Sequence, residues 1–236
     1  MTFQLPTREE KPDYVRSMFD RIAERYDLVN DAMTFGHHRR WKMDILRHVR
    51  PQKGDRCLDL ATGTGDIARG LLRKVGPEGH VTALDFSPGM LEAARKRGPH
   101  EIDWVQGDML QLPFPDASFD VVTVGFGLRN VADVPRALDE VARVLKPGGR
   151  FASLDLARVR LGLMKPFVNL YSFRIVPLIG KVLSGESEAY TYLPTSNEVF
   201  LSQDELAGQL RMRGFEPVKV QDLMGGTTAI VSGTRA

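Results

Sequence analysis

Apolar residues return along the first fifty positions with the period of an α-helix. They lie three or four residues apart at Val15, Met18, Ile22 and Tyr26, and again at Trp41, Ile45 and Val49. This spacing predicts two amphipathic helices within residues 14–49, with a break near Phe35 and Gly36.

Beyond residue 50, short apolar runs alternate with helical patterns. Strands are expected at 56–61, within 76–86, and at 102–108, 119–127 and 150–156. Helices are expected at 64–75, 87–98 and 134–145, and the second of these has Ser87 as its N-cap with Pro88 in its first turn. Strands that alternate with helices in this way predict an α/β fold with a doubly wound, parallel sheet.

The end of the chain has a different order of elements. After an interruption at 158–200 we expect a helix at 203–214 and two strands, at 215–223 and 227–233, joined by the hairpin signal Gly225-Gly226. Such a pair at the end of a parallel sheet is unusual for a dinucleotide-binding fold. One domain is expected, with an N-terminal helical cap (1–50), a core (51–157), a helical insertion or lid (158–200) and a C-terminal helix with two strands (201–236).

Composition narrows the class of protein. A chain of 236 residues with 42% hydrophobic and 26% charged residues can bury a sizeable core, and a net charge of only +2 argues against a nucleic-acid-binding protein. The single cysteine, Cys57, indicates a buried thiol, and the five scattered histidines lack metal-ligand spacing, so no metal is expected. No signal peptide and no apolar run of ~20 residues is evident, which indicates a cytoplasmic protein.

The run LDLATGTGD, residues 58–66, places a glycine turn after the first predicted strand. It fits the dinucleotide fingerprint, with Asp85 about twenty residues later, but S-adenosylmethionine (SAM) uses the same kind of turn. Asp66 would repel a pyrophosphate at the helix N-terminus. The sulfonium of SAM instead favours carboxylates, and four acids fall at or just beyond strand ends: Asp59, Asp66, Asp85 and Asp108. We therefore favour SAM over NAD, and an NAD-dependent oxidoreductase stays the distant alternative.

Each strand end has an expected role in holding SAM. Asp85 is placed to accept from both ribose hydroxyls, and Asp108 from the adenine amino group. Phe86 or Met109 would flank the ring. Gly63 and Gly65 let the backbone approach the methionine part of the cofactor.

Longer stretches carry a family resemblance. LDLATGTGD, ALDFSPGML, GDMLQLPFPDASFD and ARVLKPGGR resemble class I SAM-dependent methyltransferases, which implies a Rossmann-like, seven-stranded sheet with an antiparallel last strand. VRSMFDRIAERYDLVN, FGLRNV and AYTYLPTSNEVF resemble the ubiquinone/menaquinone biosynthesis C-methyltransferase family. The resemblance implies SAM contacts at Thr64, Asp85, Asp108 and Met109. At Gly125 some members have Ser, and Ala61 stands where the general turn often has Gly.

The resemblance also implies a reaction, the methylation of a ring carbon of a polyprenyl quinol, with demethylmenaquinol favoured over a benzoquinol. Another phenolic or lipid acceptor, or a SAM-binding module without activity, stays open. Arg129 and Asn130, just past the fourth strand, and Asp155, at the end of the fifth, are the expected catalytic residues. The alternative for Arg129 is a structural pair with an acid. Phe126, Tyr190 and Tyr192 are expected in the substrate pocket, and the alternative for both tyrosines is a packed loop.

Basic residues gather late in the chain. Eight lie between positions 143 and 181, against the single acid Asp155. Residues 158–185 mix these charges with large apolar side chains, which predicts a helical cap over the active site, contact with an anionic membrane surface, or both. The N-terminal helices around Met18, Phe19, Tyr26 and Met33 would form the other wall of the entrance, and His37 and His38 are expected at the surface or in a lid. A homo-oligomer stays open.

Overall fold

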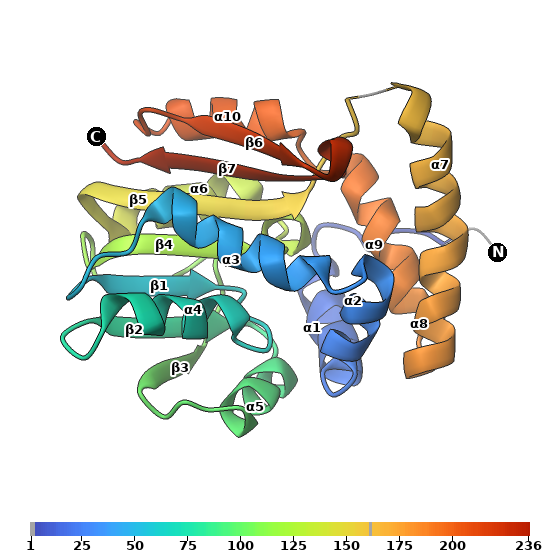
Figure 1. The fold of residues 1–236 in the computed structure, drawn as a ribbon, viewed down its shortest axis with the longest axis horizontal. Coiled ribbons are helices and arrows are strands. Elements are labelled where there is room, and N and C mark those ends of the chain that lie inside the picture. The colour runs from blue at the N-terminus through green and yellow to red at the C-terminus, as the bar shows by residue number, and fades with distance from the viewer. Residues whose placement is uncertain (1–2, 161) are drawn as a thin grey trace.

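The computed structural model describes residues 3–160 and 162–236. Its centre is one seven-stranded sheet in the order β3-β2-β1-β4-β5-β7-β6 (Figure 1). The strands are β1 (Arg56–Leu60), β2 (His80–Asp85), β3 (Ile102–Gln106), β4 (Phe119–Gly125), β5 (Leu145–Leu156), β6 (Lys219–Leu223) and β7 (Thr228–Thr234). Only β7 runs against its neighbours, because it pairs antiparallel with both β5 and β6 while the other pairs are parallel. The predicted seven-stranded, mostly parallel sheet is confirmed.

Helices cover both faces of the sheet (Figure 1). On one face, α3 (His37–Val49) and α4 (Asp66–Val75) share a core cluster with β1, β2 and β4. On the other, α6 (Val134–Val144) packs on β5, and α10 (Gln203–Arg211) packs on β6 and β7. Their N-termini are capped by side chains, Asp133 for α6 and a Ser202–Glu205 capping box for α10.

Several local expectations hold and one strand differs. Ser87 caps α5 (Pro88–Lys96) by accepting from the Met90 amide, and Cys57 is buried. β5 begins at Leu145, five residues earlier than expected, because the KPGG segment continues the strand.

The N-terminal region contains three helices where two were expected. The break at Phe35 and Gly36 is confirmed, since both residues adopt left-handed backbone conformations. The first expected helix is divided into α1 (Lys11–Ile22) and α2 (Tyr26–Thr34). The apolar spacing hid this turn because Tyr26 continues the period of Met18 and Ile22 across it.

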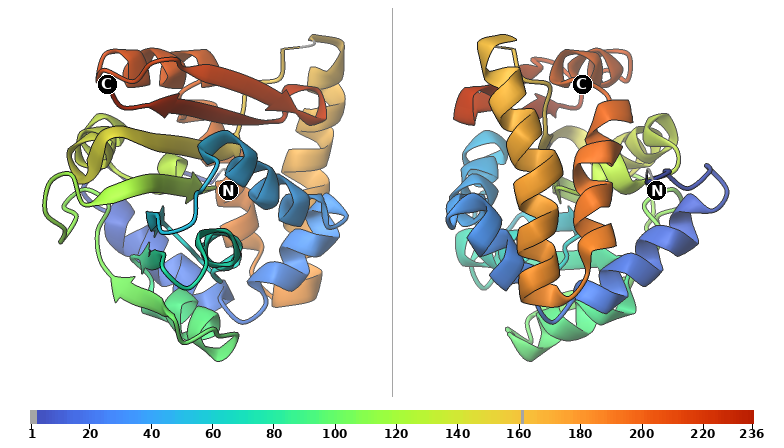
Figure 2. Two further views of the ribbon diagram at one scale, coloured as in Figure 1. Left: turned by 60° about the vertical axis from the view of Figure 1, so that its left-hand side comes forward. Right: turned by 90° about the vertical axis from the view of Figure 1, so that its right-hand side faces the viewer.

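The insertion is helical and lies on the outside of the molecule. It contains η2 (Gly162–Met164), α7 (Lys165–Leu170), the π-helical turn η3 (Tyr171–Ile175), α8 (Val176–Ser184) and α9 (Ser187–Val199). Figure 2, right, shows α7 and α8 as one long outer helix beside α9. By length and composition alone this helix, Gly162–Ser184, is long and apolar enough to cross a membrane. Of its most apolar stretch of 18 residues, 11% is buried. The expectation that no apolar run approaches ~20 residues is wrong here, because Lys165, Arg174 and Lys181 interrupt the run in the sequence without shortening the helix.

Candidate functional site

A cavity of about 820 Å³, including the part open to solvent, lies at the carboxyl ends of β1, β2, β3 and β4. Residues that follow successive strands line it: Gly63, Asp85, Phe86, Asp108, Met109, Gly125, Phe126 and Asn130. The first two helices form its roof, with Val15, Arg16, Phe19 and Tyr26 among the lining residues. The expected entrance wall is therefore present at Phe19 and Tyr26, whereas Met18 and Met33 lie in the core behind them.

The turn after β1 is shaped by left-handed backbone. Ala61, Gly63 and Gly65 all have positive φ angles, of 48°, 56° and 84°. A Cβ on Gly63 would meet nothing within 4 Å, so a ligand can approach its backbone. At the end of β4, a Cβ on Gly125 would lie 2.5 Å from Ile67 Cδ1, so glycine there lets the first turn of α4 pack directly on the strand.

Asp85 joins the two loops on either side of it. Its Oδ2 accepts from the Gly63 amide at 2.7 Å and its Oδ1 from the Ser87 amide at 2.9 Å. Each oxygen keeps capacity for one more hydrogen bond. Burial raises the pKa of Asp85 to about 6, although the amides of Ser87 and Gly63 stabilise the ionised form.

Three expected cofactor residues lie behind the cavity lining. Asp59 is fully buried, and its two oxygens accept from Thr62 at 2.6 Å and Thr123 at 2.7 Å. The hydroxyl of Thr64 donates to Asp27, and Gly65 is packed so closely on Trp104 that a Cβ would lie 2.5 Å from the ring. These residues shape the turn, and their direct contact with a cofactor stays a prediction.

Asp66 is not the free charge that the sequence argument assumed. Its carboxylate pairs with Lys42 at 2.9 Å and with Arg69 at 2.8 Å. Burial alone would raise the pKa of Asp66, but the two cations outweigh it and lower the pKa to about 2. Because the pairs neutralise this carboxylate, the repulsion of a pyrophosphate is a weaker discriminator than the sequence indicates. Asp85 and Asp108, which do line the cavity, carry the preference for a cofactor without phosphates.

The expected catalytic residues divide between the cavity and the layer behind it. Arg129 and Asp155 form a buried ion pair, with Arg129 Nη1 2.5 Å from Asp155 Oδ1, and neither lines the cavity. Burial would lower the pKa of Arg129, but Asp155 raises it. Asn130 does line the cavity, and its Nδ2 donates to the Phe126 carbonyl at 3.2 Å. Among the described residues, Asn130 Oδ1 is buried without a hydrogen-bond partner, so a ligand or water is needed to satisfy it.

The two expected pocket tyrosines lie in the core, not along the cavity. Tyr190 and Tyr192 belong to α9 and are almost fully buried in a cluster with α1, α2 and α8. Tyr192 packs against Tyr14 with ring centroids 5.6 Å apart, and burial raises its pKa to about 12. Among its described residues, the helical insertion contributes none to the lining of the cavity, and α8 packs on α2 and α9. Its role as a cap over the site stays a prediction.

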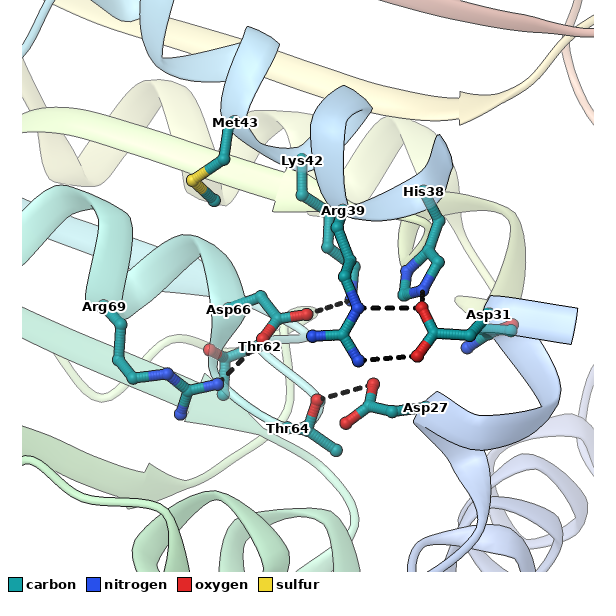
Figure 3. Close-up of polar contacts among 12 residues, drawn as sticks. Asp27, Asp31, His38, Arg39, Lys42, Met43, Thr62, Thr64, Asp66 and Arg69 are labelled. Carbon is teal, nitrogen blue, oxygen red and sulfur yellow. Dashed lines mark hydrogen bonds and ion pairs between the residues drawn. The ribbon is translucent and has the colours of Figure 1, made fainter. Parts of the chain in front are cut away.

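A charged network on the N-terminal helices is the part of the site that sequence reasoning missed (Figure 3). His38, expected at the surface or in a lid, is buried and lies 2.8 Å from Asp31. Asp27 and Lys42 reach the turn after β1 at Thr64 and Asp66. The only signal for this in the sequence is the density of charge between residues 27 and 42, which is equally typical of a solvated helix face.

The residues that line the cavity are suited to bind SAM. The cavity offers an accessible glycine backbone and two carboxylates at neighbouring strand ends, with Phe86 and Met109 beside them for an adenine ring.

Comparison with solved structures bears out the fold. A SAM-dependent methyltransferase from Aquifex aeolicus matches with a TM-score of 0.60 and 20% identity, covering 83% of this chain and 89% of that one. The [4+2]-cyclase SpnF matches with a TM-score of 0.69 and 19% identity, covering 100% and 99%. At this identity the likeness concerns the fold alone, and a cyclase among the neighbours illustrates that one fold supports different reactions.

Sequence relatives are much closer. A protein of Ruegeria sp. (strain TM1040), named ubiquinone/menaquinone biosynthesis C-methyltransferase UbiE, is 40% identical over 236 residues, covering 98% of this chain and 94% of its own length. A protein of the same name from Rickettsia akari (strain Hartford) is 42% identical over 232 residues, covering 95% and 93%. The model of the ubiE/COQ5 methyltransferase family matches residues 7–235. The chain therefore belongs to the ubiE/COQ5 methyltransferase family, whose cofactor is S-adenosyl-L-methionine.

Proposed function

We propose that this chain transfers a methyl group from SAM to a ring carbon of a polyprenyl quinol. The names of relatives about 40% identical over nearly their whole length support the reaction class. The observation that carries the proposal is the cavity itself. Its lining combines carboxylates for a cationic cofactor with Asn130, a half-buried residue whose buried Oδ1 has no partner in the part of the chain that the structure describes.

In this proposal, residues at the ends of different strands bind different parts of the cofactor. Asp85 uses the remaining capacity of its two oxygens for the ribose hydroxyls, and Asp108 accepts from the adenine amino group. Asp108 Oδ1 is already held by the Leu110 amide at 2.8 Å, which fixes the orientation of the carboxylate. The backbone at Gly63 faces the methionine part.

A ring carbon is a weak nucleophile, so the site must help the quinol to become a phenolate. When bound, SAM supplies an activated methyl group on its sulfonium. Asn130 Oδ1 accepts from the second ring hydroxyl, which stays protonated, and orients the ring, since Nδ2 is fixed on Phe126. Orientation and exclusion of water are the main contributions of such a site.

The buried Arg129–Asp155 pair acts from behind the cavity lining. Arg129 is too basic to take the hydroxyl proton, so water in the part of the cavity open to solvent takes it, and water also takes the proton that the methylated ring carbon loses. Arg129 donates to the Phe126 carbonyl at 2.9 Å and so holds the loop that carries Asn130. Because Asp155 balances its charge, Arg129 contributes by fixing this loop and not as a free cation.

The acceptor is proposed to be demethylmenaquinol, with the equivalent benzoquinol as the alternative. The names of the relatives cover both pathways. The test is mass spectrometry of the product after incubation with methyl-labelled SAM and short-chain forms of both quinols. Label on a ring carbon of either quinol supports the proposal and identifies the acceptor. Label on oxygen, or on neither quinol, contradicts it.

We also propose that the outer helix α7–α8 rests on an anionic membrane surface, at the cytoplasmic face, where a polyprenyl substrate resides. Large apolar side chains along it are exposed, namely Leu163, Phe167, Leu170, Leu178 and Val182. Residues 162–184 contain Lys165, Arg174 and Lys181 and no acid. Apolar and basic side chains together on one exposed helix are what a peripheral membrane contact requires.

A further inference from the structure

Helix α2 carries two carboxylates one turn apart that make different connections (Figure 3). Asp31 stays within the N-terminal helices, because its oxygens accept from Arg39 at 2.8 and 2.7 Å and lie 2.8 Å from His38. Asp27 instead contacts residues outside these helices. Its Oδ1 accepts from the Thr64 hydroxyl at 3.1 Å, and its Oδ2 pairs with Arg97, which follows α5. One acid therefore stabilises the cap, and the other connects it to the glycine turn.

A second connection runs from α3 to the same turn. Lys42, with only 7% of its surface exposed, donates to Asp66 Oδ2 at 2.9 Å. Asp66 begins α4 directly after Gly65, and Arg69 holds its other oxygen. The hydrogen bond between Thr64 and Asp27 and the ion pair between Lys42 and Asp66 therefore fix the residues on either side of Gly65.

A turn with two glycines in left-handed conformations has little to restrain it on its own. Every bond that orders the turn before a ligand arrives removes an entropic cost from the binding step. Thr64 and Asp66 are ordered by partners on α2 and α3, and α2 also forms part of the roof of the cavity through Tyr26.

We propose that Asp27 and Lys42 are positioning residues for the cofactor. They hold Thr64 and Asp66, and with them the backbone of Gly63 and Gly65, in the geometry that bound SAM requires, although neither side chain lines the cavity. The inference rests on the proposed placement of SAM in this cavity. Its consequence is that residues far from the glycine turn in the sequence set the affinity for the cofactor.

The test compares Asp27→Ala with Asp31→Ala, two truncations of the same residue type on the same helix. SAM affinity is measured by calorimetric titration of the full chain, and thermal unfolding is recorded without SAM. Asp27→Ala should weaken SAM binding about tenfold, as expected for the loss of charge-assisted hydrogen bonds. Asp31→Ala should lower the melting temperature and change SAM affinity by less than about twofold.

Lys42 offers a rescue experiment. Lys42→Met should weaken SAM binding about tenfold. Lys42→Arg keeps a positive charge beside the Asp66 carboxylate and should retain most of the wild-type affinity. At saturating SAM both variants should turn over quinol at the wild-type rate, so that KM for SAM changes and kcat does not. If Asp27→Ala does not fold, Asp27→Asn keeps the volume and an acceptor for Thr64 and should still weaken binding about threefold.

The outcomes separate this inference from the proposed function. Equal SAM affinities for Asp27→Ala and Asp31→Ala, or a fall in kcat with an unchanged KM for SAM, would overturn the positioning role. A wild-type chain that does not bind SAM would instead remove the cofactor assignment on which it rests.

Discussion

At the residue scale, the titration of Asp85 connects cofactor binding to pH. Its pKa of about 6 in the folded chain lies above the ordinary value of 3.8, so this group stabilises the cofactor-free fold at low pH, and that stability is lost as pH rises through 6. Cofactor affinity should move the opposite way, because only the ionised carboxylate accepts from both ribose hydroxyls.

We predict that SAM binds about tenfold more weakly at pH 5 than at pH 7.5. Calorimetric titration across this range measures the profile. Asp85→Asn serves as the control, with weaker binding that no longer depends on pH in this window. A wild-type affinity that is flat from pH 5 to 7.5 would refute the role of Asp85.

The pair of Arg129 and Asp155 makes a prediction about stability. Asp155→Asn would leave the guanidinium of Arg129 buried without its counter-charge, since the two side chains are 3% and 4% exposed. Removal of one partner from such a pair costs about 3–5 kcal/mol, which for a chain of this size lowers the melting temperature by roughly 10 °C. Differential scanning calorimetry is the measurement, and a fall of less than about 2 °C would show that water reaches the pair.

Some of the residues that line the cavity could be predicted from their positions at the ends of strands, whereas Asp59 and Asp66, predicted in the same way, lie outside the lining. Asp85, Phe86, Asp108 and Met109 each follow an apolar strand, and parallel strands bring their carboxyl ends to one edge. Asp27 and Lys42 were beyond such reasoning, because a charged residue on an amphipathic helix gives no sign of which distant loop it will meet.

At the scale of elements, α7–α8 shows why the insertion resisted interpretation. Its apolar residues follow no single face, because α8 buries Val176 against α2 and α9 while Phe167 and Leu178 stay exposed. The sequence also misled about which cations are free. Arg160 pairs with Asp204 and Asp222, so it belongs to the fold and not to a membrane surface.

We predict that the triple substitution Lys165→Glu, Arg174→Glu and Lys181→Glu lowers co-sedimentation with anionic vesicles at least tenfold and leaves SAM affinity unchanged. Each basic residue near an anionic surface contributes about 1 kcal/mol. The matched control places the same charge change on three exposed residues, Lys53 in the turn before β1 and Arg73 and Lys74 of α4. Equal vesicle binding by both triple variants would contradict the membrane contact. A change in molecular mass confined to the first variant would indicate a second copy of the chain on this helix instead.

At the scale of the whole molecule, alternation of strands and helices was enough to predict the layers and the direction of most strands. The order of the sheet, with β7 inserted between β5 and β6, places the hairpin at one edge and leaves the ends of β1, β2, β3 and β4 free to form the cavity. The roof could not be predicted in the same way. It depends on the turn between α1 and α2, which leaves the hydrophobic period unbroken.

The proposed function requires that the cavity at the strand ends is a SAM site built around Asp85. Calorimetric titration of the wild-type chain and of Asp85→Ala, each with SAM and with NADH at pH 7.5, tests this most directly. We predict that wild type binds one SAM and no NADH, and that Asp85→Ala binds SAM at least tenfold more weakly. Binding of NADH by the wild type, or an unchanged SAM affinity in Asp85→Ala, would contradict it.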